Sequence, residues 1–157
     1  MLGGLARWLR AAGYESHFEY GIDDRELVRR ALAAGGVLLS SDGPMFERNI
    51  IRGGQVRALY VPQQLSKLEQ LRFVLKSLGL PMARPRCMSC GGALALVPKH
   101  EVMDEAPPLA YRNCSTFFRC AGCGKLFWQG THWQKIRRRL EEIEREQEER
   151  PTEDRLP

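Results

Sequence analysis

The chain has 157 residues, of which 43% are hydrophobic and 27% are charged, and its formal net charge at pH 7 is +5. This composition supplies enough apolar side chains for a core and excludes a chain that is disordered throughout. No apolar run approaches the roughly 18 residues of a membrane span, so we expect no membrane partner. The amino-terminal segment carries Arg7 and Arg10 and lacks the apolar stretch of a secretion signal. We therefore expect a cytoplasmic protein.

The first half of the chain alternates predicted helices and strands. Apolar residues at helical spacing predict a helix over residues 2–12 that ends at Gly13. Asp23, with Glu26 three residues later, predicts a second helix that begins like a capping box and ends at Gly35-Gly36. The other predicted elements are strands over Glu15–Tyr20, Val37–Ser40 and Val56–Val61, a brief helix over Met45–Ile51, and a helix from Ser66 to Gly79. This order with short loops is typical of a parallel α/β sheet.

The second half begins with a proline-containing linker over residues 81–85, which leads into a segment with two cysteine pairs. Leu126–Trp128 is predicted to be the last strand of this segment. Thr131 and Gln134 predict a capping box at the start of a C-terminal helix. Its inner face is predicted to carry Trp133, Ile136, Leu140 and Ile143. Residues 151–157 are predicted to be a frayed tail.

The cysteines have the spacing of a metal site. The pairs Cys87-x-x-Cys90 and Cys120-x-x-Cys123 are separated by 29 residues, and a glycine follows each pair. Each pair can present two sulfurs to one ion, and two pairs complete the tetrahedral site typical of structural Zn²⁺. Disulfides are the alternative, which the lack of a secretion signal disfavours. Cys114 is either a fifth ligand or, as we expect, a small buried apolar side chain.

The charge is distributed unevenly along the chain. Residues 84–139 carry 10 basic and 3 acidic residues, a net charge of +7, whereas residues 140–157 have a net charge of −5. Of the 24 basic residues 19 are arginines, whose guanidinium groups bind phosphates in a bidentate manner. The basic middle third therefore predicts contact with a nucleic acid.

Three aspartates lie where a parallel sheet would place ligands. Asp42 follows the predicted strand Val37–Ser40, and Asp23 and Asp24 lie in the loop before the second helix, at the same predicted edge. Carboxylates gathered there would hold Mg²⁺ or Mn²⁺ and orient a water for phosphodiester hydrolysis. The alternative is local in each case: Asp23 or Asp24 caps a helix, and Asp42 is a turn residue.

Five segments of the chain resemble the Mut7-C RNase domain family, in the right order over residues 1 to about 140. They are Met1–Tyr14, Val37–Asp42, the two cysteine pairs with Arg86 and Gly124, and Gly130–Trp133. The resemblance implies an α/β fold with a PIN-like parallel sheet and flanking helices, then a zinc-ribbon module and a C-terminal helix, with metal-dependent RNase activity. We expect a PIN-like domain over residues 1–83, a four-cysteine zinc ribbon over 84–130, a basic-to-acidic helix over 131–150 and the tail over 151–157.

The resemblance also implies catalytic roles. Asp42 matches the acidic residue of the family's strand-end motif, and Ser40 stands in the place of its threonine. Asp24 matches the acidic residue that opens the second helix, and Asp23 competes for that place. These residues would bind the catalytic Mg²⁺ or Mn²⁺.

Other matches concern RNA. Arg7 and Arg10 match the two arginines of the family's first helix and are expected to clamp backbone phosphates; the alternative is a solvated helix face. His132 matches the histidine of the closing motif, and near Lys135 at a helix N-terminus it would suit an anion. Its alternative role is to orient the ribbon against the helix.

The sequence departs from the family at its start. Family members carry a short apolar strand that ends in an aspartate directly before the segment matching Met1-Leu2-Gly3, and the sequence given begins at Met1. We expect the chain as given to lack one carboxylate of the catalytic set and to bind that cation poorly. Two hypotheses follow: a metal-dependent RNase, and a non-catalytic zinc-ribbon protein that binds RNA or protein on a degenerate nuclease scaffold. Association into a homo-oligomer is left open.

Overall fold

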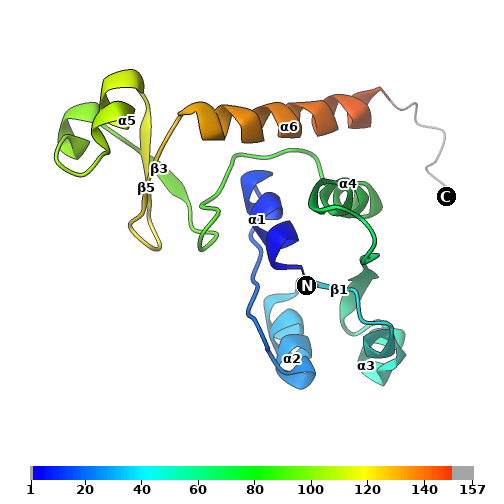
Figure 1. Cartoon of the computed structure of the whole chain (residues 1–157). Helices are drawn as coiled ribbons and strands as arrows, with labels where there is room; N and C mark the ends of the chain where they lie inside the picture. Colours follow the sequence, from blue (N-terminus) through cyan, green and yellow to red (C-terminus); the bar gives the residue numbers. More distant parts are fainter. Residues whose placement is uncertain (1, 150–157) are drawn as a thin grey trace. The chain divides into compact units, whose positions relative to one another are not determined.

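The computed structural model describes residues 2–149, and Figure 1 shows their helices and strands. The chain divides into two compact units. The first consists of Met1–Trp8 and His17–Leu80, and the second of Leu9–Ser16 and Pro81–Pro157. The helix α1 (Gly3–Ala11) contributes its first residues to one unit and its last to the other.

The first unit contains a small parallel sheet, formed by β1 (Val37–Ser40) and β2 (Arg57–Tyr60). Val37 pairs with Arg57, and Ser40 pairs with Tyr60. The remaining elements of this unit are α2 (Asp24–Ala34), the 3₁₀ turn η1 (Gly43–Glu47), α3 (Asn49–Arg52) and α4 (Lys67–Leu78). The predicted α/β class with a parallel pair of strands and helices is confirmed.

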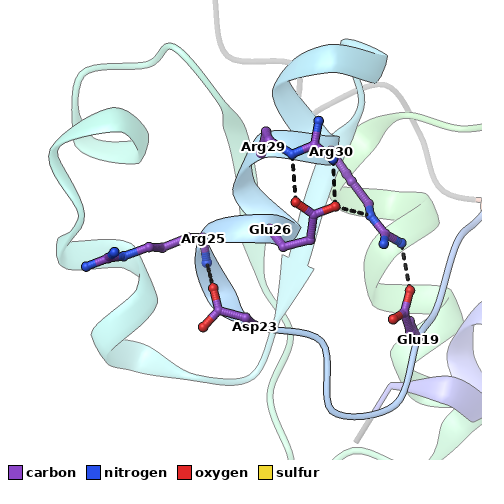
Figure 2. Close-up of polar contacts among 6 residues, drawn as sticks. All are labelled: Glu19, Asp23, Arg25, Glu26, Arg29 and Arg30. Carbon is purple, nitrogen blue, oxygen red and sulfur yellow. Dashed lines mark hydrogen bonds and ion pairs between the residues drawn. The ribbon is translucent and has the colours of Figure 1, made fainter.

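The ends of the helices follow their sequence signals. Asp23 caps α2, and Gly35 ends it in the left-handed region with φ of 59°. Ser66 and Glu69 form a complete capping box at the start of α4. Glu26 does not complete a second box in the same way; its carboxylate binds arginines of its own helix instead (Figure 2). Local residue chemistry therefore fixes where these helices start and stop.

A cluster of apolar side chains holds the sheet to its helices. The buried members come from α2, β1, η1 and the residue before β2; they are Val28, Leu38, Met45 and Val56. Leu27, Ala31, Phe46, Ile50, Ile51 and Ala58 pack against them. Each of these elements is too short to be stable alone, so the cluster is what keeps them together.

The predicted strand over Glu15–Tyr20 is wrong, because this segment forms no strand. Its aromatic side chains are exposed to different degrees: Phe18 is 43% exposed and Tyr20 is 76% exposed. Apolar residues that alternate with polar ones make a strand only where one face is buried and a neighbouring strand accepts the backbone hydrogen bonds. Neither condition holds for residues 15–20.

The second unit contains an antiparallel sheet of β3 (Leu94–Val97), β4 (Phe117–Cys120) and β5 (Leu126–Trp128), with β4 in the centre. The strand predicted over Leu126–Trp128 is confirmed. Between β3 and β4 the chain forms the 3₁₀ turn η2 (Lys99–Val102) and the short helix α5 (Pro108–Asn113). These elements fill the 29-residue interval between the cysteine pairs.

The interval has an apolar cluster of its own. Val102, Ala106, Cys114 and Phe117 are buried in it, and Val97, Tyr111, Leu126 and Trp128 pack around them. Cys114 is 9% exposed and lies outside the group formed by the other four cysteines. Its predicted role as a small buried apolar side chain is therefore confirmed.

The C-terminal helix α6 (Thr131–Glu148) buries Ile136, Leu140 and Ile143 on one face, as predicted, whereas Trp133 is only half-buried. The capping box predicted at Thr131 is wrong. The cap is Gly130, which has an extended backbone and, as a glycine, no side chain to accept a hydrogen bond. Thr131 is already the first helical residue.

The predicted tail over residues 151–157 lies outside the described residues. None of the helices within residues 2–149 has the length and apolar character to cross a lipid bilayer.

Candidate functional site

The four paired cysteines meet at one point of the second unit. Their Sγ atoms all lie within 4.8 Å of one another, with 3.7 Å between Cys87 and Cys123 and 3.4 Å between Cys90 and Cys120. In a tetrahedral site with Zn–S bonds of about 2.3 Å, neighbouring sulfurs lie about 3.8 Å apart. All four are free cysteines, so the disulfide alternative is not seen. The cluster has the ligands and the size to hold one zinc ion.

Two similar turns build this cluster. The Gly91 N–H donates to the Cys87 carbonyl at 2.7 Å, and the Gly124 N–H donates to the Cys120 carbonyl at 3.0 Å. Both glycines have positive φ, 84° and 71°, a region that side chains rarely adopt. A Cβ at Gly92 would lie only 2.8 Å from the Cys120 sulfur. The glycines thus allow each turn to close and the two turns to approach.

Backbone N–H groups and burial act differently on two of the thiols. Burial raises the pKa of Cys120, but the N–H of Cys123, together with Cys90 and Gly122, outweighs it and lowers that pKa to about 6. At Cys87 burial dominates and raises the pKa to about 11. A bound cation would therefore be needed to keep Cys87 as a thiolate near neutral pH.

Two of the predicted aspartates have local partners in the first unit. Asp23 accepts a hydrogen bond from the Arg25 N–H at 2.8 Å, as the cap of α2 (Figure 2). The Asp24 carboxylate pairs with the Arg48 guanidinium, also at 2.8 Å. Because Arg48 follows η1, this ion pair places the start of α2 next to the segment that leaves the carboxyl end of β1. Asp24 is thus occupied by Arg48, and the convergence of the aspartates at one edge of the sheet stays a prediction.

Asp42 has a different environment. It is exposed just after β1, and its carboxylate makes no capping hydrogen bond to η1. Its backbone N–H donates to Oγ of Ser40 at 3.0 Å. Beside it, the buried Oγ of Ser41 has no hydrogen-bond partner within the described part of the chain. Asp42 is therefore the aspartate of the three whose carboxylate remains available.

The aspartates do not form a ligand cluster comparable to the cysteines. Across residues 2–149, the four cysteines are the one group of three or more His, Cys, Asp or Glu residues with ligand atoms within 4.8 Å of one another. Asp23, Asp24 and Asp42 therefore do not converge as a set of three. Their catalytic roles stay predictions.

The predicted RNA contacts divide into exposed and buried residues. Arg7 is exposed on α1, and His132 and Lys135 are exposed in the first part of α6. Arg10 is only 7% exposed, and its guanidinium donates to backbone carbonyls near the first cysteine pair. The available basic side chains are thus Arg7, His132 and Lys135.

Sequence reasoning did not predict that Lys125 and Arg86 brace the cysteine turns. The Lys125 ammonium donates to Oγ of Ser89 at 3.0 Å and so links the two turns. Nε of Arg86 donates to the Gly91 carbonyl at 2.6 Å. Their signal in the sequence is position alone, since Arg86 directly precedes the first pair and Lys125 follows the glycine of the second.

Comparisons with known proteins give one match. No curated protein and no solved structure matches the chain. The Mut7-C RNAse domain family matches residues 1–140, a range that includes the three aspartates, both cysteine pairs and the first half of α6. That range is most of the chain, and the protein therefore belongs to the Mut7-C RNAse domain family.

Proposed function

We propose that the protein is a metal-dependent ribonuclease that hydrolyses RNA phosphodiester bonds and binds the RNA strand beside a zinc-bound module. The match to the Mut7-C RNAse domain family over residues 1–140 carries this proposal. The cysteine cluster supports the zinc part, and the available Asp42 carboxylate supports the hydrolytic part.

The zinc ion would have a structural role. Four cysteine ligands leave no open position for water or substrate, so the ion holds the fold and takes no part in hydrolysis. Cys87 and Cys90 lie before β3, Cys120 ends β4, and Cys123 lies between β4 and β5. Zinc bound by all four would fasten the ends of the three strands.

Asp42 is the residue that we assign to RNA hydrolysis. Of the three aspartates, Asp23 caps helix α2 and Asp24 forms an ion pair with Arg48. Asp42 is therefore the one available carboxylate of the three, whereas proteins commonly bind Mg²⁺ through one or two carboxylates together with the substrate phosphates. We expect cleavage by this chain to be weak and to depend on Asp42.

The RNA strand would contact the basic residues of the second unit. Residues 84–139 have a net charge of +7. In α6, Arg137 and Arg139 pair with glutamates of their own helix, whereas Lys135 and Arg138 form no ion pair within the described part of the helix. Together with His132, these free cations are available to phosphates.

A cleavage assay tests the hydrolytic proposal. Labelled single-stranded RNA is incubated with the full chain and Mg²⁺, Mn²⁺ or EDTA. We expect slow, cation-dependent cleavage that Asp42→Asn lowers by at least about 100-fold, a usual size for the loss of a catalytic group. Glu47→Gln, a neighbouring exposed carboxylate, is the matched control and should retain the wild-type rate. Cleavage that persists in EDTA or in Asp42→Asn would contradict the proposal.

A second function is favoured because Asp23 caps a helix and Asp24 is paired with Arg48. In that case the chain binds RNA without cutting it. The wild type would then show no cation-dependent cleavage, yet its affinity for RNA would fall steeply between about 50 and 200 mM salt, because phosphate contacts release counterions. An affinity that does not change with salt would exclude phosphate-based binding under both hypotheses.

A further inference from the structure

Arg10 is a buried arginine that bonds the turn of the first cysteine pair. Its side chain is 7% exposed. Nη1 donates to the carbonyl oxygens of Met88 at 3.1 Å and Ser89 at 2.8 Å, and Nε donates to the carbonyl of Ser16 at 2.8 Å. All of these residues belong to the second unit. A desolvated guanidinium is retained only where such acceptors satisfy it.

The two carbonyls belong to the peptide groups that face a metal ligand. The N–H groups of Ser89 and Cys90 hydrogen-bond the Cys87 sulfur. The Met88 carbonyl and the Ser89 N–H form one peptide group, and the Ser89 carbonyl and the Cys90 N–H form the next. Each of these groups therefore lies between the Arg10 guanidinium at its oxygen end and the Cys87 sulfur at its N–H end. Through these two carbonyls, the guanidinium holds both central peptide groups of the turn from one side.

We propose that Arg10 is a positioning residue for the zinc site: from the carbonyl side it fixes the Cys87–Cys90 turn, so that both sulfurs point at the ion. The proposal rests on the zinc part of the proposed function and is independent of RNA hydrolysis. Residues that orient metal ligands in this way commonly contribute 10–100-fold to metal affinity.

The surroundings of Arg10 match this role. The backbone N–H of Arg86, directly before Cys87, donates to the Arg10 carbonyl at 2.9 Å. A Cβ at Gly91 would lie 3.5 Å from Arg10 Nε, an ordinary contact distance, so the guanidinium packs directly beside the glycine that closes the turn. A lysine could replace the charge, but its single ammonium lacks the planar fork that reaches carbonyls on two sides.

The same geometry separates Arg10 from Arg7. Both arginines lie on α1, three residues apart, but Arg7 is exposed. A phosphate approaching Arg10 would have to displace bonds to three carbonyls, whereas Arg7 has a free guanidinium within the described residues. Arg7→Ala is therefore a matched control for the loss of one arginine from the same helix.

The test measures metal binding by the full chain. Zinc affinity is determined by competition with a chromophoric chelator for the wild type, Arg10→Ala, Arg10→Lys and Arg7→Ala. We expect a loss of about 10–100-fold for Arg10→Ala, a smaller loss for Arg10→Lys, and no change for Arg7→Ala. The cobalt-substituted proteins report on geometry: the thiolate-to-cobalt absorption bands should shift in both Arg10 variants and stay constant in Arg7→Ala.

The outcomes separate the two proposals. If the wild type binds zinc and Arg10→Lys has the same affinity and cobalt spectrum, the role of Arg10 is overturned. Because Arg10→Lys keeps the charge and most of the side-chain volume, this comparison holds even if Arg10→Ala does not fold. If the wild type itself binds no zinc, both the zinc part of the proposed function and the role of Arg10 are overturned.

Discussion

The two units of this chain solve the problem of gathering ligands differently. In the second unit, four cysteines from two turns bring their sulfurs within 4.8 Å of one another. In the first unit, three aspartates that flank a helix and a strand have separate environments: one caps α2, one pairs with Arg48, and one remains available. The thiol site is assembled within the described residues, and the carboxylate site is not.

The difference follows from how each ligand set is encoded. A Cys-x-x-Cys turn places two ligands by local backbone geometry, so only two turns must meet. A carboxylate site at a sheet edge needs the ends of several elements to converge, and every aspartate there can instead cap a helix or pair with an arginine. Four predictions break or sharpen this comparison.

The largest effect is expected from loss of one metal ligand. Cys90→Ser should reduce bound zinc from about one ion per chain to almost none and unfold the second unit, because binding of structural zinc is worth on the order of 10 kcal/mol in small zinc domains. Metal content and near-ultraviolet circular dichroism measure it. Cys114→Ala is the control, since that cysteine packs in the apolar cluster and should leave zinc bound. Full zinc content in Cys90→Ser would show that the four cysteines do not act as one site.

A core substitution in the first unit should destabilise the fold without changing the zinc content. Leu38 is 2% exposed in the middle of β1. Leu38→Ala should lower the free energy of unfolding by about 2–5 kcal/mol, the usual cost of a large-to-small change in a core, while zinc content stays constant. Denaturant titration and metal analysis check both parts. A parallel loss of zinc would mean that the two units do not keep separate sites.

The aspartates should differ in what they contribute to stability. Asp23→Ala removes the cap of α2 and should cost about 1 kcal/mol. Asp42→Asn removes no hydrogen bond of the carboxylate and should change the free energy of unfolding by less than about 0.5 kcal/mol. Urea titrations of the two variants distinguish a structural aspartate from an available one. Equal destabilisation would argue that Asp42 has a local role after all.

The smallest expected effect is on how the stability of the fold depends on pH in the acidic range. Side-chain hydrogen bonds from Arg29, then from Arg30, lower the pKa of Glu26 from its ordinary 4.5 to about 2 (Figure 2). Between these values the unfolded chain binds the proton that the folded chain does not, so folding gains stability as pH rises through this window. The contribution is complete above about pH 4.5 and is lost as pH falls through about 2. The difference in stability between wild type and Glu26→Gln should therefore shrink between pH 5 and pH 2.

What the sequence predicts well here is local. The cysteine pairs with their glycines, the Asp23 cap and the Ser66 capping box each depend on a few neighbouring residues, and the structure has all of them. The parallel pairing of β1 and β2 also follows from their pattern, since both are short strands flanked by helices.

What the sequence does not show depends on distant partners. The segment 15–20 alternates like a strand, but it is not part of either sheet among the described residues. Gly130 caps α6 without a side chain, so no polar residue in the sequence marks this helix start. Arg10 looks like the exposed Arg7 in the sequence, and only its contacts with residues 78 and 79 positions away distinguish the two. Long-range packing decides each of these cases.

The interval between the cysteine pairs has a consequence for how this module can diversify. A metal ion that joins both ends of a segment acts as a cross-link, and the entropy lost in closing such a loop grows only with the logarithm of its length, about 0.6 kcal/mol for each doubling. The 29 residues here already accommodate η2 and α5. Longer or different insertions at this place would therefore change the free energy of metal binding little. New surface can thus be added to the ribbon while the four cysteines stay as they are.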